Sequence, residues 1–455
     1  MDRLMVSVSG VRGTVGKTLT PRVAMEFGCA FGTMLGAGRT VTISRDTRPS
    51  GAMLRSAVAA GLTACGVNVV DLGVVTTPGA ALMTRTLGCD GGVILTASHN
   101  PSPYNGIKFL QPSGPALPAD QAERLKEIWR QGNFALQDSL HTGSESHNAD
   151  THETHVTAVC ETVDPAAIAA GGFTAVLDSI NGAGCAASPI LLKRLGCKLV
   201  HLNAEPTGRF AHEPEPIEPN LGALGQAVLR EKANVGFAQD PDADRLVLVD
   251  EQGRFIGEEY TLALAAAFVL RHRKGKLAVN LSTSRMIDDI AAAAGVEVVR
   301  APTGEANVVE AMQREGCIFG GEGNGGVIDP RVVSVRDSLT GMAMILQYLA
   351  ETGKPLSELV AAIPAYHLLK LKFPCPADAA AKVVEKTRAA FANRPGATFN
   401  NADGLRINLS DRWVSVRASN TEPIMRIFAE APSRADAEAL AGEVQALAQS
   451  VIGAG

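Results

Sequence analysis

The sequence lacks the features that membrane proteins and nucleic-acid-binding proteins need. None of its apolar runs approaches the roughly 20 residues that span a bilayer; the stretch 262–270 is too short and is flanked by charge. Arg12 and Lys17 interrupt any apolar stretch near the N-terminus, so no signal peptide is predicted. Aromatic residues make up only 4% of the chain and the formal net charge is -5, which disfavours base stacking and binding to a phosphate backbone. We therefore expect a cytoplasmic protein with no nucleic-acid partner and no membrane partner.

Closely spaced cysteine pairs are also absent. The eight cysteines include no C-x-x-C pair and most lie in apolar segments, which predicts reduced, buried thiols and not a disulfide-dependent fold. At 455 residues the chain is long enough for about three domains of ordinary size. Its 46% hydrophobic and 20% charged residues are typical of globular domains that bury their own cores.

Short apolar runs alternate with helical stretches through most of the chain, which predicts an α/β fold with parallel strands and right-handed crossovers. In the first part, strands are predicted at 40–43, 67–71 and 92–95, and helices at 49–65 and 78–87. The polar stretch 139–150 has no periodicity and is predicted to be a loop or linker. The alternation restarts in 174–250 and 276–329, which predicts two further α/β units.

The regular alternation of strands and helices ends at about Pro364. Beyond it, hairpin-like strands with flanking helices predict a smaller α+β domain. The predicted strands are 404–409, 413–417 and 425–429, and the predicted helices are 378–391 and 434–451.

The first motif whose residues could take part in a reaction is Thr96-Ala97-Ser98-His99-Asn100-Pro101, directly after a predicted strand. A strand that ends in such a turn can present Ser98 as a nucleophile, although a neutral serine needs a base or prior phosphorylation. Side chains of adjacent residues on an extended segment point apart, so we do not expect Ser98 and His99 to pair. A polar loop with an Asn-Pro turn is the alternative interpretation.

The second motif is Asp240-Pro241-Asp242-Ala243-Asp244-Arg245, which lies between two apolar strands. Alternating aspartates can direct three carboxylates to one side, and such oxygen ligands suit Mg²⁺. Without a cation, two charges about 4 Å apart repel by about 4 kcal/mol at an effective dielectric constant of about 20. The alternatives are a solvated acidic loop and an EF-hand, but Arg245 stands where an EF-hand needs glycine.

The third motif is the glycine-rich loop 320–326, in which Glu322 and Asn324 can contact hydroxyl groups of a ligand. Glycines let the backbone approach a ligand closely. A flexible turn explains the motif equally well.

The fourth motif is Arg417-Ala418-Ser419-Asn420-Thr421-Glu422-Pro423, with Arg426 beyond it. Arginine forks match phosphate oxygens, and short polar side chains with backbone N–H groups complete such a cradle. An ordinary turn is the alternative, but two arginines in one loop favour phosphate.

Arg12 and Lys108 are lesser candidates, since a lone basic residue usually lies on the surface. His147, His152 and His155 lie in or beside the predicted linker and are interpreted as solvated residues, not as a metal cluster.

The four loops in this order, running from Ser9-Gly10-Val11-Arg12-Gly13 to Arg426, resemble the α-D-phosphohexomutase family. The resemblance implies three similar α/β domains with mixed sheets plus a smaller C-terminal α+β domain around a central cleft. It therefore raises the expected number of domains from three to four. The expected domains are 1–150, 151–252, 253–364 and 365–455.

The resemblance also implies roles for individual residues. Ser98 resembles the phosphorylated catalytic serine, with Lys108 as a candidate general acid/base, Arg12 near the transferring phosphoryl group, and His99 and Arg245 also in the catalytic set. Asp240, Asp242 and Asp244 resemble Mg²⁺ ligands, with an oxygen of the phosphorylated Ser98 as the fourth. Glu322, Asn324, Gly304 and Glu305 fall in the sugar-binding loops, and Arg417, Ser419, Asn420, Thr421 and Arg426 match the site for the distal phosphate.

The sequence departs from the family pattern in the sugar loop. Many bacterial members have Ser and His where Asn324 and Gly326 stand, so a histidine near the reacting oxygen is missing here. The implied function is interconversion of hexose or hexosamine 1-phosphate and 6-phosphate through a phosphoserine and a hexose 1,6-bisphosphate, as phosphoglucosamine mutase or phosphomannomutase. The alternatives are a metal-dependent sugar-phosphate phosphatase and a non-catalytic sugar-phosphate-binding protein, and the expected oligomeric state is a monomer or homodimer.

Overall fold

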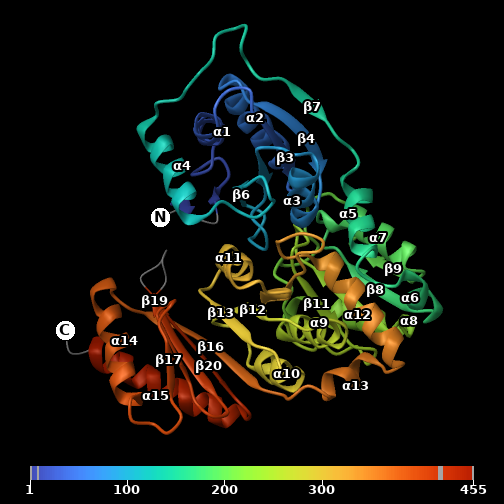
Figure 1. The fold of residues 1–455 in the computed structure, drawn as a ribbon, viewed down its shortest axis with the longest axis vertical. Coiled ribbons are helices and arrows are strands. Elements are labelled where there is room, and N and C mark those ends of the chain that lie inside the picture. The colour runs from blue at the N-terminus through green and yellow to red at the C-terminus, as the bar shows by residue number, and fades with distance from the viewer. Residues whose placement is uncertain (1–2, 8–9, 419–423, 453–455) are drawn as a thin grey trace.

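The computed structural model describes residues 3–7, 10–418 and 424–452, apart from the side chains of residues 377 and 378. In this part of the chain the strands form four sheets, each built from one consecutive stretch of sequence, and we call these stretches units I to IV. Figure 1 shows the units following one another in an arc, from unit I at the top to unit IV at the lower left. Three α/β units followed by one α+β unit confirm the predicted fold class.

Unit I holds a seven-stranded mixed sheet in the order β1-β2-β6-β5-β3-β4-β7. Its centre is parallel because helices connect β3, β4 and β5, whereas β2 and β6 run antiparallel to their neighbours. The strands are β1 (Met5–Ser7), β2 (Gly10–Thr14), β3 (Thr40–Arg45), β4 (Asn68–Val74), β5 (Gly91–Leu95), β6 (Tyr104–Leu110) and β7 (Glu145–His147). The helices are α1 (Pro21–Leu35), α2 (Gly51–Ala64), α3 (Thr77–Thr86) and α4 (Ala119–Gln131).

The prediction that 139–150 is only a loop or linker is wrong in part, because β7 lies within it and pairs in parallel with β4. All three residues of β7 are exposed, so this edge strand has no apolar pattern from which it could be predicted. The predicted helix 49–65 starts too early, because α2 begins at Gly51 and Ser50 is its N-terminal flanking residue.

Units II and III each hold a four-stranded sheet, ordered β11-β10-β8-β9 and β13-β12-β14-β15. Both combine parallel strands with one antiparallel hairpin, β10–β11 and β14–β15. The strands are β8 (Thr174–Asp178), β9 (Lys198–Leu202), β10 (Val235–Gln239), β11 (Leu246–Val249), β12 (Leu277–Asn280), β13 (Val298–Ala301), β14 (Phe319–Glu322) and β15 (Gly326–Ile328). The helices are α5 (Thr151–Cys160), α6 (Pro165–Ala170), α7 (Gly184–Arg194), the short 3₁₀ helix η1 (Glu218–Asn220), α8 (Gly222–Glu231), α9 (Glu259–His272), α10 (Met286–Ala294), α11 (Glu305–Glu315), α12 (Ser338–Thr352) and α13 (Leu356–Ala361).

Unit IV holds an entirely antiparallel sheet in the order β16-β20-β19-β18-β17. Helices α14 (Ala377–Phe391) and α15 (Arg434–Ile452) pack against it and close a separate hydrophobic core around Phe391, Ile407 and Ile427. The strands are β16 (His367–Pro374), β17 (Thr398–Asn400), β18 (Leu405–Asn408), β19 (Trp413–Ala418) and β20 (Ile424–Ala431).

The four motifs occupy the same place in their units. Each falls where the chain passes from one strand to the next, antiparallel one, namely β5–β6, β10–β11, β14–β15 and β19–β20, although residues 419–423 of the fourth motif lie outside the described residues. Units I, II and III share one hydrophobic core, which includes residues of α3, α7, α9 and α12 and fixes the first three loops relative to one another. No helix in the described ranges is long and apolar enough to cross a membrane.

Candidate active site

The Ser98 loop leaves β5 in an unusual backbone conformation. Ser98 has φ 48°, in the left-handed region that side chains other than glycine rarely adopt. Its N–H donates to Thr96 Oγ1 at 2.9 Å and its carbonyl accepts from Arg48 at 2.7 Å. The surrounding contacts therefore hold Ser98 in a strained, specific orientation.

Arg48 is the main support of this loop and is 1% exposed. Its Nη atoms donate to the carbonyls of Ser98 at 2.7 Å, Asn100 at 2.6 Å, Pro101 at 3.0 Å and Tyr104 at 2.9 Å. Its Nε donates to Asp46 Oδ2 at 3.1 Å, so a buried ion pair anchors the guanidinium. One side chain thus holds both ends of the loop.

The expectation that Ser98 and His99 do not pair is wrong. Ser98 Oγ lies 3.3 Å from His99 Nδ1. The left-handed φ of Ser98 breaks the extended geometry that would separate adjacent side chains. Burial, and then the charges of Arg245 and Arg12, lower the pKa of His99 to about 3, so its imidazole is neutral at physiological pH.

The three aspartates lie together and adjoin Ser98. Ser98 Oγ donates to Asp240 Oδ2 at 2.9 Å, while Asp240 Oδ1 accepts from the N–H groups of Asp244 and Arg245, both at 3.1 Å. Ala243 has φ 56°, so the loop curls back on itself. The carboxylates therefore meet because of this turn and not because the loop is an extended strand of alternating residues.

Each of the other two aspartates has one carboxylate oxygen held and one without a partner. Asp242 Oδ2 accepts from Lys108 Nζ at 2.8 Å and from Thr77 Oγ1 at 2.7 Å, and Asp244 Oδ2 accepts from Arg336 at 2.6 Å. The two Oδ1 atoms are buried and accept no hydrogen bond from the described residues.

One carboxylate oxygen from each aspartate of the triad lies within 4.8 Å of the others. Burial, and then the charges of Asp244 and Asp242, raise the pKa of Asp240 well above its usual value. Buried oxygens without partners, crowded carboxylates and a hard-ligand set are what a small divalent cation needs, so these residues fit Mg²⁺.

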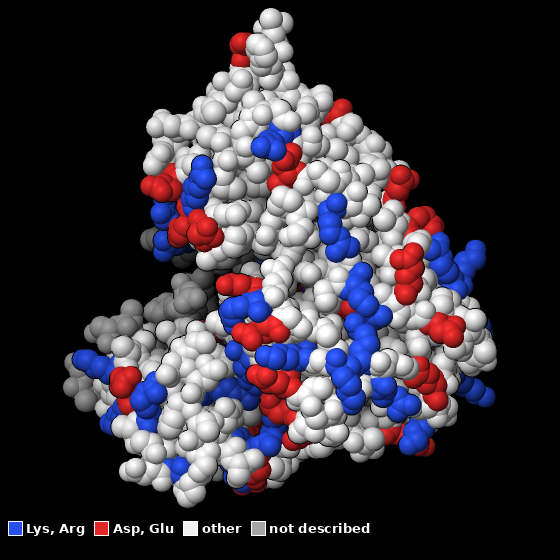
Figure 2. All heavy atoms as spheres, viewed as in Figure 1, with Lys and Arg blue, Asp and Glu red and all other residues white. Residues whose placement is uncertain are grey.

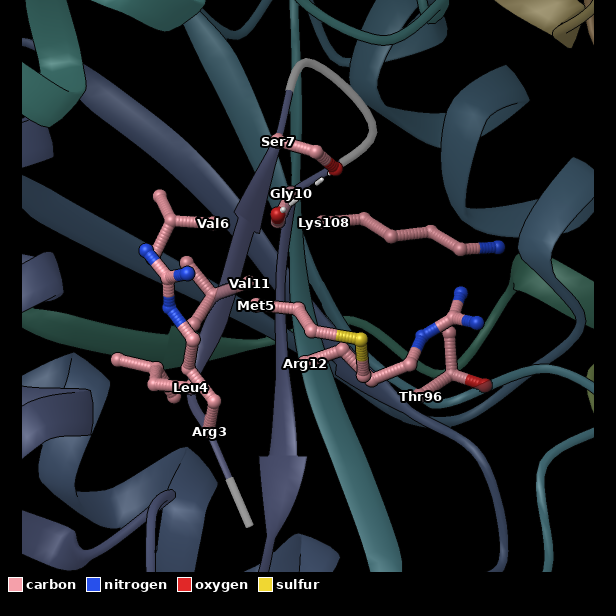
Figure 3. Close-up of a pocket in the computed structure, with 10 residues that line it drawn as sticks. All are labelled: Arg3, Leu4, Met5, Val6, Ser7, Gly10, Val11, Arg12, Thr96 and Lys108. Atoms are coloured by element: carbon pink, nitrogen blue, oxygen red, sulfur yellow. Dashed lines mark hydrogen bonds between the residues drawn. The ribbon is translucent and has the colours of Figure 1, made fainter. Parts of the chain in front are cut away.

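Lys108 and Arg12 extend from neighbouring antiparallel strands, β6 and β2, towards the same side (Figure 3). Together with Thr96 they line a pocket of about 390 Å³. Arg12 donates to Asn100 Oδ1 at 2.6 Å, which connects it to the Ser98 loop. Burial lowers the pKa of Lys108, but the charges of Asp242, Asp244 and Glu305 and the hydrogen bond to Asp242 together outweigh burial, so the net shift is upward.

The molecule has a hollow beside unit I. Figure 2 shows the surface hollowed between unit I above and unit IV at the lower left. A second pocket of about 360 Å³ lies between unit I and α11, with Gln111 and Ala119 on one side and Asn307 and Glu310 on the other. A cleft therefore separates unit I from units III and IV.

The sugar loop places Glu322 in a buried polar network. Glu322 accepts from Asn280 Nδ2 at 2.8 Å, from Gly304 N at 3.1 Å and from Arg336 at 3.0 Å. Burial raises the pKa of Glu322, but the charge of Arg336 together with the hydrogen bonds from Asn280 and Gly304 and the charge of Arg245 outweigh burial, so the net shift is downward and this carboxylate stays ionised. The predicted pair Gly304 and Glu305 lies beside it, as Glu305 accepts from Arg336 Nε at 2.9 Å. Asn324 Nδ2 lies 3.5 Å from Glu322.

Arg417 and Arg426 lie directly opposite each other on β19 and β20, at the end of the hairpin. Like charges at such a position repel, and an anion between them would remove that cost. Arg417 Nε is buried without a hydrogen-bond partner in the described structure, and its nearest carboxylate, on Asp403, is 3.6 Å from Nη1. The predicted phosphate-binding residues Ser419, Asn420 and Thr421 lie outside the described residues.

Sequence reasoning missed several polar side chains of this region, namely Asp46, Arg48, Thr77 and Arg336. Asp46 and Arg48 follow β3 directly, and a polar run at the carboxyl end of a parallel strand could have identified them. Arg336 stands in a loop with no motif around it.

The interpretation of His155 as a solvated residue is wrong. His155 is 1% exposed, and its Nε2 lies 2.9 Å from Asp337 Oδ2, so it joins α5 to the start of α12. Its position near the predicted linker was misleading because α5 packs against the body of the protein.

Family models for phosphoglucomutase/phosphomannomutase match almost the whole chain. The model of α/β/α domain I matches residues 3–136, that of domain II matches 153–253, that of domain III matches 257–366, and that of the C-terminal domain matches 368–447.

Individual proteins agree with these matches. A probable phosphoglucosamine mutase from Methanopyrus kandleri is 40% identical over 96% of this chain and 95% of its own. A phosphoglucomutase/phosphomannomutase from Thermococcus kodakarensis is 41% identical over 93% of this chain and 94% of its own. The crystal structure of a phosphoglucomutase/phosphomannomutase family protein from Burkholderia thailandensis has 29% identity and a TM-score of 0.85, and the match covers 98% of both chains.

The four family models and these relatives define the class of the present protein, a mutase of the phosphoglucomutase/phosphomannomutase type. Within that class the chain belongs to the α-D-phosphohexomutase family, so it is an enzyme of the isomerase type. The resemblance drawn from the four loops is confirmed.

Proposed function

We propose that this phosphohexomutase interconverts the 1-phosphate and 6-phosphate of a hexosamine or hexose through a phosphoserine at position 98 and a hexose 1,6-bisphosphate. The observation that carries the proposal is the contact of Ser98 Oγ with Asp240 at 2.9 Å, inside a triad with buried unpartnered oxygens. A serine held against such a cluster is placed to carry a phosphoryl group beside a cation. Glucosamine and mannose phosphates are the proposed substrates, in keeping with the names of the relatives.

In the proposed reaction the phosphoryl group passes from the Ser98 oxygen to the free hydroxyl of a sugar monophosphate. The P–O bond to serine breaks, a P–O bond to the sugar forms, and the hydroxyl proton ends on the serine oxygen. We assign the relay of this proton to Lys108, whose Nζ donates to Asp242 at 2.8 Å while Ser98 Oγ donates to Asp240 of the same triad. The bisphosphate then turns over and returns its other phosphoryl group to Ser98, so one reaction centre serves both ends of the sugar.

The remaining residues bind and neutralise charge, which is most of what phosphoryl transfer requires. Asp240, Asp242 and Asp244, with an oxygen of phosphorylated Ser98, would hold Mg²⁺, which neutralises charge on the transferring group when bound. Arg417 and Arg426 would hold the distal phosphate without distinguishing the two ends of the sugar, and Glu322 would accept hydrogen bonds from sugar hydroxyls in either orientation.

The test is turnover of glucosamine, mannose and glucose 1-phosphates by the wild type and by Ser98→Ala, with a trace of the matching 1,6-bisphosphate. We expect conversion to 6-phosphate by the wild type, loss of turnover in Ser98→Ala, and wild-type turnover in the control Ser56→Ala, an exposed serine on α2. Near-normal turnover by Ser98→Ala would overturn the phosphoserine scheme. Release of inorganic phosphate in place of 6-phosphate would indicate a phosphatase.

Three further proposals rest on the sequence alone. The domain boundaries 1–150, 151–252, 253–364 and 365–455, a monomeric or homodimeric state and a cytoplasmic location stay predictions, to be checked by limited proteolysis, sedimentation and cell fractionation.

A further inference from the structure

One buried arginine outside the predicted site residues joins three of the functional loops. Arg336 lies between β15 and α12 and is 8% exposed. Its Nη2 donates to Asp244 Oδ2 at 2.6 Å, its Nη1 to Glu322 Oε2 at 3.0 Å and its Nε to Glu305 Oε2 at 2.9 Å. A single guanidinium therefore contacts the metal loop, the sugar loop and the start of α11.

The contact with Asp244 orients that carboxylate. Because Arg336 takes Oδ2, the other oxygen is left buried and without a hydrogen-bond partner among the described residues. A guanidinium is planar and directional, so it fixes the rotation of a carboxylate better than the flexible ammonium of a lysine does. Arg336 thus orients Asp244 so that its Oδ1 stays free to bind a cation within the triad.

The contacts with Glu322 and Glu305 bring two carboxylates to one cation. Without Arg336 the two acids and Asp244 would lose the one cation that contacts all three, which is costly in a buried site because Lys108 and Arg245 offset their charge only in part. Arg336 therefore also sets the position of Glu322, the residue we propose to contact sugar hydroxyls.

Arg336 also explains the missing side chain at position 326. A Cβ on Gly326 would lie 2.2 Å from Arg336 Cδ and 2.7 Å from its Cγ, closer than real contacts allow. The stem of Arg336 therefore occupies the space in which a side chain at position 326 would begin. Gly326 has no positive φ, so space alone requires glycine here.

We propose that Arg336 is a positioning residue that couples the metal loop to the sugar loop, and that Gly326 is its obligatory partner. The proposal rests on the proposed roles of Asp244 and Glu322. It predicts that one substitution at position 336 weakens both metal binding and substrate binding.

The first experiment measures Mn²⁺ binding by calorimetry without substrate, together with KM and kcat, in Arg336→Met and Arg336→Lys. Loss of a side chain that orients a metal ligand typically weakens metal affinity about 10- to 100-fold. We expect that loss in Arg336→Met with a raised KM, and a smaller loss in Arg336→Lys, which keeps the charge. The control is Arg331→Met, an exposed arginine on the same loop that pairs with Asp329. Unchanged Mn²⁺ affinity in Arg336→Met would overturn the proposal.

The second experiment tests the pairing of positions 326 and 336. Gly326→Ala should weaken Mn²⁺ binding and raise KM in the wild type, because the new methyl group displaces Arg336. The same change in the Arg336→Ala background should add nothing, since the obstructing stem is gone. Additive effects of the two substitutions would overturn the pairing.

Asp242→Asn separates this proposal from the proposed function. If Asp242→Asn loses Mn²⁺ binding while Arg336→Met retains it, only the Arg336 proposal is wrong. If Asp242→Asn binds Mn²⁺ as the wild type does, the proposed metal site is wrong and the Arg336 proposal falls with it.

Discussion

Replacing Arg48 by methionine should release the Ser98 loop from the body of unit I. The substitution keeps an apolar stem of similar length but removes the partner of Asp46, a carboxylate that is 0% exposed. Breaking a buried ion pair in this way costs about 3–5 kcal/mol. Four carbonyl oxygens lose their donors as well, although such losses within one network do not add in full.

The assay is hydrogen exchange measured by mass spectrometry, because a multidomain chain need not unfold in a single step. The N–H groups of Thr96, Ser98, Asn100 and Tyr104 are all hydrogen-bonded in the loop. If their local opening becomes easier by 3–5 kcal/mol, exchange in the peptide 96–104 should accelerate roughly a hundred- to several-thousand-fold. Strand β9, in unit II, should be unaffected.

Two comparisons make this prediction specific. The double variant Asp46→Asn/Arg48→Met should recover part of the lost protection, since no buried charge is then left unpaired. Arg39→Met is the control, because Arg39 forms an exposed pair with Asp90 on the same unit and should change stability by less than about 1 kcal/mol. If the amide hydrogens of the peptide 96–104 exchange in Arg48→Met at rates within tenfold of those in the wild type, the proposed role of Arg48 is wrong.

Three further predictions concern the other units. Arg417→Ala should raise the KM for sugar phosphate about 10- to 100-fold, because the substrate loses about one charged hydrogen bond. Steady-state kinetics measure this change, and an unchanged KM would show that Arg417 does not bind the phosphate. Burial lowers the pKa of His212, but its hydrogen bonds to Asp178 and to the Glu213 carbonyl, together with the charges of these two residues, outweigh burial and the net shift is upward. The net shift of the Asp178 pKa is downward. The stabilisation from this pair is therefore present between the two shifted pKa values and is lost as pH rises through that of His212. The difference in Tm between the wild type and His212→Gln should accordingly be larger at about pH 5.5 than at about pH 9, and a difference independent of pH would contradict this. Gly325 has φ 85°, and a Cβ there would lie 2.3 Å from the carbonyl oxygen of Leu246. Gly325→Ala should therefore lower the free energy of unfolding by more than about 1 kcal/mol, measured by thermal unfolding. An unchanged Tm would show that the loop backbone can shift to accept the methyl group.

The alternation of strands and helices, and the first three motif loops between strands, could be predicted from the sequence. Each loop follows an apolar strand and concentrates residues of one chemical type, such as the three aspartates after β10. Signals of this kind are local, because strand, turn and reactive residues lie within about a dozen positions. Strand β7 escaped prediction since its residues are all exposed and carry no alternating pattern.

The contacts between loops could not be predicted in the same way. Arg336 meets Glu322, Glu305 and Asp244, which stand 14, 31 and 92 positions away in the chain. A lone arginine in a loop has no pattern that distinguishes it from a surface residue. The pairing of Ser98 with His99 depends on a single left-handed φ, which the residue type does not favour.

The placement of each motif in a hairpin loop of its own sheet has a consequence for how such an enzyme can diversify. The four motifs, to which we assign chemistry, metal, sugar and phosphate, belong to separate hairpins, so one hairpin can change without refolding the sheet that carries another. The first three loops share a core, whereas unit IV has its own and meets unit III through contacts such as that of Arg285 N with Glu430 at 2.9 Å. Rotation of unit IV as a rigid body would then admit substrate and release product. Such a rotation would move Arg417 and Arg426 while Ser98 and the three aspartates stay assembled.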